Sequence, residues 1–160
     1  MLGSMTVGAA ATALSFLSAL SGTWTCTMPV PAHNGTPASS VSSTWRIAAG
    51  PGQSNWATFT YGKGTTTWGT AYVGYVEQQH RWVYMDFHND GAIAEMHAPP
   101  AADPTWVWTG SYYPEGGPAD PNGQITWTLA APNTIDRNFQ KRQNGTLVEL
   151  SRDVCTRAHS

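Results

Sequence analysis

The chain contains 160 residues, enough for one domain that buries about two-thirds of its unfolded surface. Only 11% of the residues are charged and the formal net charge is −2, so no excess of positive charge steers the protein toward nucleic acid or an anionic membrane, and a neutral partner is favoured. Eight Trp, six Tyr and four Phe lie in short runs punctuated by Thr, Val and Gly, a composition that favours strands over helices. We therefore expect an all-β protein.

The segment before the first strand admits two interpretations. It is mostly small and apolar, as in a secretory leader, but the first basic residue of the chain is Arg46. Three leucines, Leu14, Leu17 and Leu20, recur on one side of a helix that Gly22 could end. We therefore prefer a short docking helix to a cleaved leader. No apolar run approaches the ~18 residues of a membrane span.

Ten short runs rich in aromatic and β-branched residues, bounded by Gly, Pro, Asn or Asp, are typical of strands. In chain order they cover residues 22–27, 41–48, 56–61, 66–76, 81–88, 92–98, 105–112, 124–129, 134–142 and 146–156. Their spacing of roughly 8 to 14 residues favours a single closed up-and-down antiparallel barrel of about 8 to 10 strands, with a sandwich as the alternative. The Pro-, Gly- and Ser-rich residues 29–40 indicate a long loop. Residues 1–4 are interpreted as a cloning remnant, and residues 5–160 as one β-barrel domain.

The two cysteines lie in the first and last of these strands. In a closed barrel the terminal strands are neighbours, so a disulfide between Cys26 and Cys155 is geometrically reasonable. In the chain-entropy model a loop of this length stabilises the fold by about 4 to 5 kcal/mol. The alternative is two unrelated buried thiols in a reducing cytoplasm. A bridge implies a periplasmic or secreted protein, and its absence a cytoplasmic one.

Several short motifs resemble those of lipocalin-like (calycin) barrels. The opening Phe16-Leu-Ser-Ala-Leu-Ser-Gly-Thr-Trp24 is similar to the Leu-x-Gly-x-Trp entry into calycin barrels. Further runs are similar to the uncharacterised bacterial DUF1579 group, namely Tyr72-Val-Gly-Tyr75, Arg81-Trp-Val83, Asn89-Asp-Gly91, residues 106–110 and Cys155-Thr-Arg157. The resemblance implies a closed barrel with an internal cavity and, for most members, no assigned activity. The pattern of haem-binding nitrobindins is not matched, so no cofactor is expected.

The segment from His80 to Ala98 is the clearest hairpin and holds most of the titratable side chains. Asp90-Gly91 predicts a two-residue type I′ turn. That register places Asp86 opposite Glu95 and Tyr84 opposite His97. One face then holds Trp82, Tyr84, Asp86, His88, Ile93, Glu95 and His97, and the other holds Val83, Met85, Phe87, Ala92, Ala94, Met96 and Ala98.

Which face of this hairpin points into the barrel stays open in the sequence. An apolar face turned inward leaves the ionisable groups in water, whereas Trp82 and Tyr84 favour an inward polar face. If the polar face is inside, two carboxylates within about 5 Å share a proton and suit acid–base catalysis. The candidate catalytic residues are Asp86, Glu95, His88, His97 and Tyr84. The same groups could bind zinc, but no metal motif such as His-Glu-x-x-His occurs, and no metal is predicted.

Aromatic residues supply the candidate ligand-binding wall, although most of them could simply be core. The candidates are Trp45, Trp56, Trp68, Trp82, Trp106, Trp108 and Tyr112. Lining a cavity, they would form a stacking surface for one flat or lipidic molecule. The expected function is therefore binding of a small hydrophobic or aromatic ligand by a monomer or homodimer. The alternatives are a cofactor-free cyclase, isomerase or hydrolase and a purely structural or partner-binding barrel.

Overall fold

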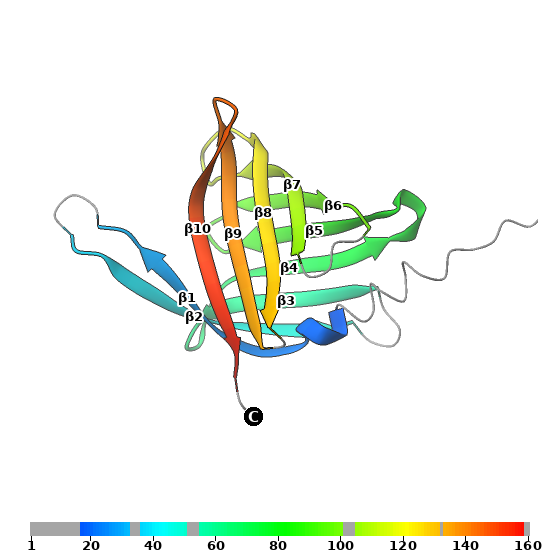
Figure 1. Ribbon diagram of the computed structural model, residues 1–160, viewed down its shortest axis with the longest axis horizontal. Coiled ribbons are helices and arrows are strands. Elements are labelled where there is room, and N and C mark those ends of the chain that lie inside the picture. Colours follow the sequence, from blue (N-terminus) through cyan, green and yellow to red (C-terminus); the bar gives the residue numbers. More distant parts are fainter. Residues whose placement is uncertain (1–16, 33–35, 51–54, 101–104, 132, 159–160) are drawn as a thin grey trace, which may run out of the picture.

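Ten strands form one closed antiparallel barrel in the computed structural model, which describes residues 17–32, 36–50, 55–100, 105–131 and 133–158. The strands are β1 (Gly22–Val30), β2 (Ser39–Ala49), β3 (Trp56–Lys63), β4 (Thr66–Val76), β5 (Arg81–His88), β6 (Ile93–Ala98), β7 (Thr105–Tyr113), β8 (Asp120–Ala131), β9 (Thr134–Gln143) and β10 (Thr146–Arg157). Each strand pairs with its neighbours in the chain, and β1 also pairs with β10 (Figure 1). The predicted all-β class and single up-and-down barrel are confirmed.

The only helical turns in the described ranges are short. A single turn of α-helix covers residues 17–20, and a 3-10 turn, η1 (Glu77–Gln79), joins β4 to β5. Neither is long and apolar enough to cross a membrane. The helix agrees with the predicted docking helix, but Leu14 and residues 1–4 lie outside the described residues, so their assignments stay predictions.

The hairpin of β1 and β2 is longer than predicted, and it projects from the barrel wall (Figure 1). Residues 29–40 are not all loop, because Pro29 pairs with Ser40 and Val30 with Ser39. Strand β10 pairs with β1 only as far as Thr27, so the outer part of β1 has a partner on one side alone. A proline that lacks an N–H is tolerated at such an edge.

The seam between the first and last strands carries the disulfide. Cys26 lies directly opposite Cys155 in the β1–β10 register, and a disulfide joins them. Both residues are fully buried. The predicted bridge is therefore present, and it closes the same seam that the backbone hydrogen bonds close.

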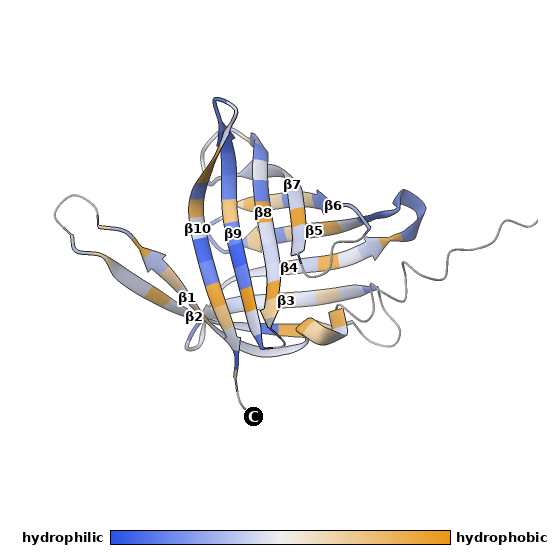
Figure 2. Ribbon diagram, in the orientation of Figure 1, coloured by the Kyte–Doolittle hydropathy of each residue, from blue (hydrophilic) through white to orange (hydrophobic). Residues whose placement is uncertain are grey.

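The short helix at residues 17–20 seals one end of the barrel, together with the start of β1 and the end of β10. Leu17 and Leu20 are 1% exposed and make this helix the hydrophobic turn at the barrel base (Figure 2). The indole N–H of Trp24 donates to the carbonyl of Leu20 at 2.8 Å. The guanidinium of Arg157 lies 4.2 Å from the centroid of the Trp24 ring and donates to two carbonyls at the helix end. These contacts exclude water from the base.

Large aromatic side chains fill the barrel next to this sealed end. Trp82 packs edge-on against Trp106 and Trp108, with ring centroids 5.7 and 6.4 Å apart. All three indoles are at most 4% exposed. Offset and edge-to-face ring pairs of this kind each add about 0.5–1.5 kcal/mol beyond area burial. The packed half of the barrel is thus a conventional core.

The β5–β6 hairpin departs from the predicted register by one residue. His88 and Ala92 close the loop, with the N–H of His88 donating to the Ala92 carbonyl at 2.9 Å, so the loop contains the three residues 89–91 rather than two. Gly91 adopts a φ of +93°, which fits a type I turn followed by a glycine bulge. Asp86 therefore pairs with Ala94, and the predicted pairing with Glu95 is wrong.

Candidate functional site

The half of the barrel away from the sealed base encloses a cavity of about 300 Å³. Along β5 the inward side chains pass from Trp82, which is 1% exposed, through Tyr84 and Asp86 to His88, whose side chain is 29% exposed. The cavity therefore opens towards the turn between β5 and β6. Its wall is lined by Met28, Val41, Ser43, Trp45, Phe59, Tyr61, Trp68, Ala71, Tyr84, Asp86, His88, Ala94, Tyr112, Ile125, Trp127, Arg137, Phe139, Ser151 and Asp153.

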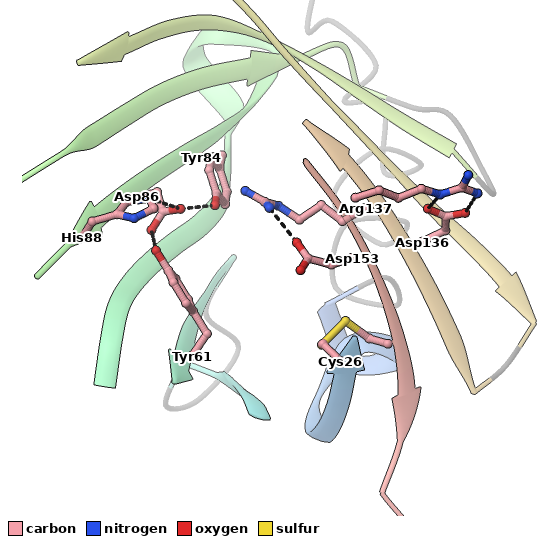
Figure 3. Close-up of polar contacts among 10 residues, drawn as sticks. Cys26, Tyr61, Tyr84, Asp86, His88, Asp136, Arg137 and Asp153 are labelled. Carbon is pink, nitrogen blue, oxygen red and sulfur yellow. Dashed lines mark hydrogen bonds and ion pairs between the residues drawn. A yellow bond between two sulfur atoms is a disulfide. The ribbon is translucent and has the colours of Figure 1, made fainter. Parts of the chain in front are cut away.

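A buried carboxylate lies at the centre of one wall. Asp86 is 2% exposed, and it accepts hydrogen bonds from the hydroxyls of Tyr84 at 2.6 Å and Tyr61 at 2.8 Å. The Nε2 atom of His88 lies 3.4 Å from Oδ2 of Asp86. Figure 3 shows these three side chains converging on Asp86 from β3 and β5. The alternation of β5 turns Tyr84, Asp86 and His88 inward together, because they share one parity.

The protonation states in this cluster follow from burial and hydrogen bonding. Burial alone would raise the pKa of Asp86, but hydrogen bonds from His88 and Tyr84 outweigh it and hold that pKa below its usual value. Burial and the adjacent carboxylate raise the pKa of both Tyr61 and Tyr84. At neutral pH the site thus holds a carboxylate anion with two protonated phenols as donors.

An ion pair lies on the opposite wall. The Nη1 atom of Arg137 on β9 is 2.9 Å from Oδ2 of Asp153 on β10, and the two side chains are 14% and 11% exposed. Figure 3 shows the guanidinium pointing across the barrel towards Tyr84. Burial opposes the charge of Arg137, but the surrounding negative groups raise its pKa above the usual value. The guanidinium also lies 5.8 Å from the centroid of the Trp45 ring.

Aromatic rings make up most of the remaining wall. Trp127 links the packed half to the cavity, since its ring centroid lies 5.2 Å from that of Phe59 and 5.4 Å from that of Tyr84. Tyr112 contacts Phe139 at 5.5 Å near the open end. In all, eight aromatic residues line the cavity, namely Trp45, Phe59, Tyr61, Trp68, Tyr84, Tyr112, Trp127 and Phe139. Such a wall stacks on a flat or apolar molecule.

The structure divides the five predicted catalytic residues between two surfaces. Tyr84, Asp86 and His88 face the cavity. Glu95 and His97 point outward, where their side chains are 48% and 25% exposed, because the three-residue loop shifts β6 by one position. The residue of β6 that lines the cavity is instead Ala94. The proposed pair of carboxylates is therefore not formed.

The predicted aromatic residues fall into three groups. Those that line the cavity are Trp45, Trp68 and Tyr112. Those that are buried in the packed half are Trp82, Trp106 and Trp108. Trp56 lies on the outer surface, 38% exposed, over Gly74 of the neighbouring strand, where a Cβ atom would lie 2.2 Å from the indole ring. Trp56 therefore cannot contact a ligand in the cavity.

Five polar residues of the cavity are absent from the predicted set, namely Ser43, Tyr61, Arg137, Ser151 and Asp153. A signal for two of them is present in the strand alternation. Arg137 shares its parity with the inward Ile135, and Asp153 shares its parity with Cys155, which the seam places inside. A charged residue on the inward parity of a barrel strand marks a polar cavity.

The charged groups of the cavity do not form a metal site. Within the described ranges no three His, Cys, Asp or Glu side chains lie close enough together to hold a metal ion. Glu95 and His97, which the sequence places in such a cluster, lie outside the barrel.

A comparison with protein-family models found no match for this chain, and a comparison with curated proteins found none either. The likeness to lipocalin-like barrels and to the DUF1579 group therefore stays a prediction. The function must be argued from the cavity itself.

Proposed function

We propose that the barrel binds one small hydrophobic or aromatic molecule in its interior. The observation that carries this proposal is a cavity of about 300 Å³ lined by eight aromatic residues, within a barrel whose other half is tightly packed. Cavities of this size accept a single two- or three-ring compound. A barrel that served only as a scaffold would fill this space with side chains, as the packed half of this barrel does.

The experiment compares two phenylalanine substitutions on β6. Ala94 is 4% exposed and lines the cavity, so Ala94→Phe places a ring in the ligand space. Glu95→Phe places the same ring on the outer surface one residue along. The neutral probe N-phenyl-1-naphthylamine is expected to gain fluorescence with the wild type and with Glu95→Phe, but not with Ala94→Phe. Equal fluorescence for both variants would show that the probe binds elsewhere and would contradict the proposal.

A cofactor-free cyclase, isomerase or hydrolase is a second candidate, favoured by the convergence of Tyr61, Tyr84 and His88 on Asp86. A general base works best with a pKa near the working pH. The pKa directions run the other way, since that of Asp86 is lowered and those of the tyrosines are raised. We therefore rank binding first. For the enzyme, Asp86→Asn assayed well below its own melting temperature should abolish turnover, and unchanged turnover would eliminate this candidate.

We also propose that the chain is a divergent lipocalin-like barrel that folds in an oxidising compartment. The lipocalin-like assignment is supported by the up-and-down topology and by the contact of Arg157 with Trp24. These two residues belong to the first and the last of the motifs that resemble calycin barrels. The second part is supported by the disulfide, since such bridges persist mainly in secreted and periplasmic proteins.

A further inference from the structure

We infer that the ligand is a neutral aromatic molecule with a carbonyl oxygen, and that this oxygen accepts hydrogen bonds from Arg137. The inference rests on the proposed binding function and names the chemistry of the ligand. It follows from three properties of the cavity wall: the hydrogen-bond donors it leaves unused, the acceptors it has already used, and the balance of its charges.

Two residues paired across β8 and β9 carry unused hydrogen-bond donors. A guanidinium has five N–H groups, and within the described residues the one acceptor that Arg137 meets is Asp153. Trp127 is the direct cross-strand partner of Arg137 in the β8–β9 register, and it also lines the cavity. Its indole Nε1 is buried and meets no acceptor in the described part of the chain. Buried donors without acceptors are costly, so a ligand oxygen at this point is strongly favoured.

The most deeply buried acceptor of the cavity, the carboxylate of Asp86, is by contrast already engaged. Both oxygens of Asp86 accept hydrogen bonds from tyrosine hydroxyls, and His88 also contacts Oδ2. Oδ2 of Asp153 accepts a hydrogen bond from Arg137. A ligand donor aimed at Asp86 therefore has to displace existing donors, whereas a ligand acceptor placed at Arg137 meets N–H groups that have no partner.

The charges of the wall argue against a charged ligand. Its ionisable groups are Asp86, Asp153, Arg137 and His88, together with the phenols of Tyr61, Tyr84 and Tyr112. Two carboxylates already face one guanidinium, and even a protonated His88 would only balance them, so an anionic ligand finds no excess positive charge. A cationic ligand would compete with Arg137 for the same carboxylates. A neutral acceptor avoids both costs.

Four naphthalenes of nearly the same shape separate these ligand classes. They are 2-acetylnaphthalene, 2-isopropylnaphthalene, 2-naphthoate and 1-(2-naphthyl)ethylammonium, measured by isothermal titration calorimetry on the full chain at neutral pH. The ketone is expected to bind about tenfold more tightly than each of the others, because a hydrogen bond to a charged donor adds to the shared ring contacts. The carbonyl stretching frequency of the bound ketone should fall below its value in hexane.

Two double variants test the assignment to Arg137. Arg137→Met with Asp153→Leu removes the donor without leaving a buried unpaired carboxylate, and should erase the preference for the ketone over 2-isopropylnaphthalene. Asp136→Leu with Arg152→Met removes the outward-facing ion pair at adjacent positions of the same two strands and should preserve that preference (Figure 3).

Several results would overturn the inference while leaving the binding function intact. These are equal affinity for the ketone and the isopropyl compound, tighter binding of the anion or the cation, or an unshifted carbonyl frequency in the wild-type complex. The frequency measurement needs no variant, so it decides the matter even if the inner double variant does not fold. Failure of all four naphthalenes to bind would instead reject the proposed function together with the inference.

Discussion

Removing the Tyr84 hydroxyl should destabilise the protein by an amount that depends on pH. The hydroxyl lies 2.6 Å from Oδ2 of Asp86, and both residues are at most 3% exposed. Tyr84→Phe keeps the ring and deletes one hydrogen bond to a charged acceptor, a contribution of about 1.5–3 kcal/mol to the free energy of unfolding. Because the deleted hydrogen bond favours the charged form, the pKa of Asp86 should rise in Tyr84→Phe.

The sign of the pH dependence follows from the lowered pKa of Asp86. An aspartate has a pKa of about 3.9 in the unfolded chain, so its stabilising contribution is complete above that pH and is lost as the pH falls through the folded-state value. Tyr84→Phe brings the pKa of Asp86 in the folded protein closer to its value in the unfolded chain. The stability difference between wild type and variant should therefore be largest at neutral pH and should shrink below about pH 4.

Two measurements check this expectation. Urea unfolding at a series of pH values gives the free energies, and carbon NMR of the aspartate side-chain carboxyls gives the pKa of Asp86. Tyr72→Phe is the matched control, because Tyr72 is 46% exposed on the outer wall and should change stability by less than about 0.5 kcal/mol. Equal losses in the two variants, or an unchanged pKa of Asp86 in Tyr84→Phe, would refute the reasoning.

Three further substitutions address the seam, the inner ion pair and the backbone contacts. Replacing Cys26 and Cys155 together by alanine should lower the free energy of unfolding by about 5 kcal/mol in the chain-entropy model, because the bridge spans a separation of 129 residues. Equal urea midpoints for the variant and the wild type would contradict this. Arg137→Met should lower the free energy of unfolding by about 3–5 kcal/mol because it leaves the carboxylate of Asp153 buried without a partner, and adding Asp153→Leu should recover most of the loss. Strictly additive losses in the double-mutant cycle would argue against an interaction between the two side chains. Gly110→Ala should lower the free energy of unfolding by about 1–3 kcal/mol, because a Cβ atom there would lie 2.0 Å from a carbonyl oxygen of β6. An unchanged melting temperature would contradict the close approach of β6 and β7.

The strand pattern of the chain was accessible from sequence because turn residues and alternation are local signals. The predicted span of β4, residues 66–76, agrees with the structure, and the pairing of Cys26 with Cys155 follows once the barrel is assumed to close. The outer part of the β1–β2 hairpin was missed because Pro29 and its small neighbours carry a loop composition. Composition cannot reveal that a strand has one free edge on which proline is tolerated.

The site was harder to predict because it depends on register. A single additional loop residue at the β5–β6 turn moves Glu95 from the inner to the outer face, since side chains alternate with a period of two. Asp-Gly is compatible with both loop lengths, so the sequence alone does not decide between them. Tyr61 and Arg137 come from β3 and β9, on opposite walls, and their meeting with the β5 residues requires the closed barrel.

The covalent seam also makes the barrel resistant to being divided. Because one sulfur–sulfur bond joins its first strand to its last, a single cut anywhere between Cys26 and Cys155 leaves one molecule. An endoprotease that nicks the exposed turn at Asn144 and Gly145 should yield fragments that migrate as one species on a non-reducing gel and separate after reduction. Because the two fragments stay covalently linked, every strand of the cleaved chain keeps its neighbours close by, and the barrel should refold after denaturation as a unimolecular process.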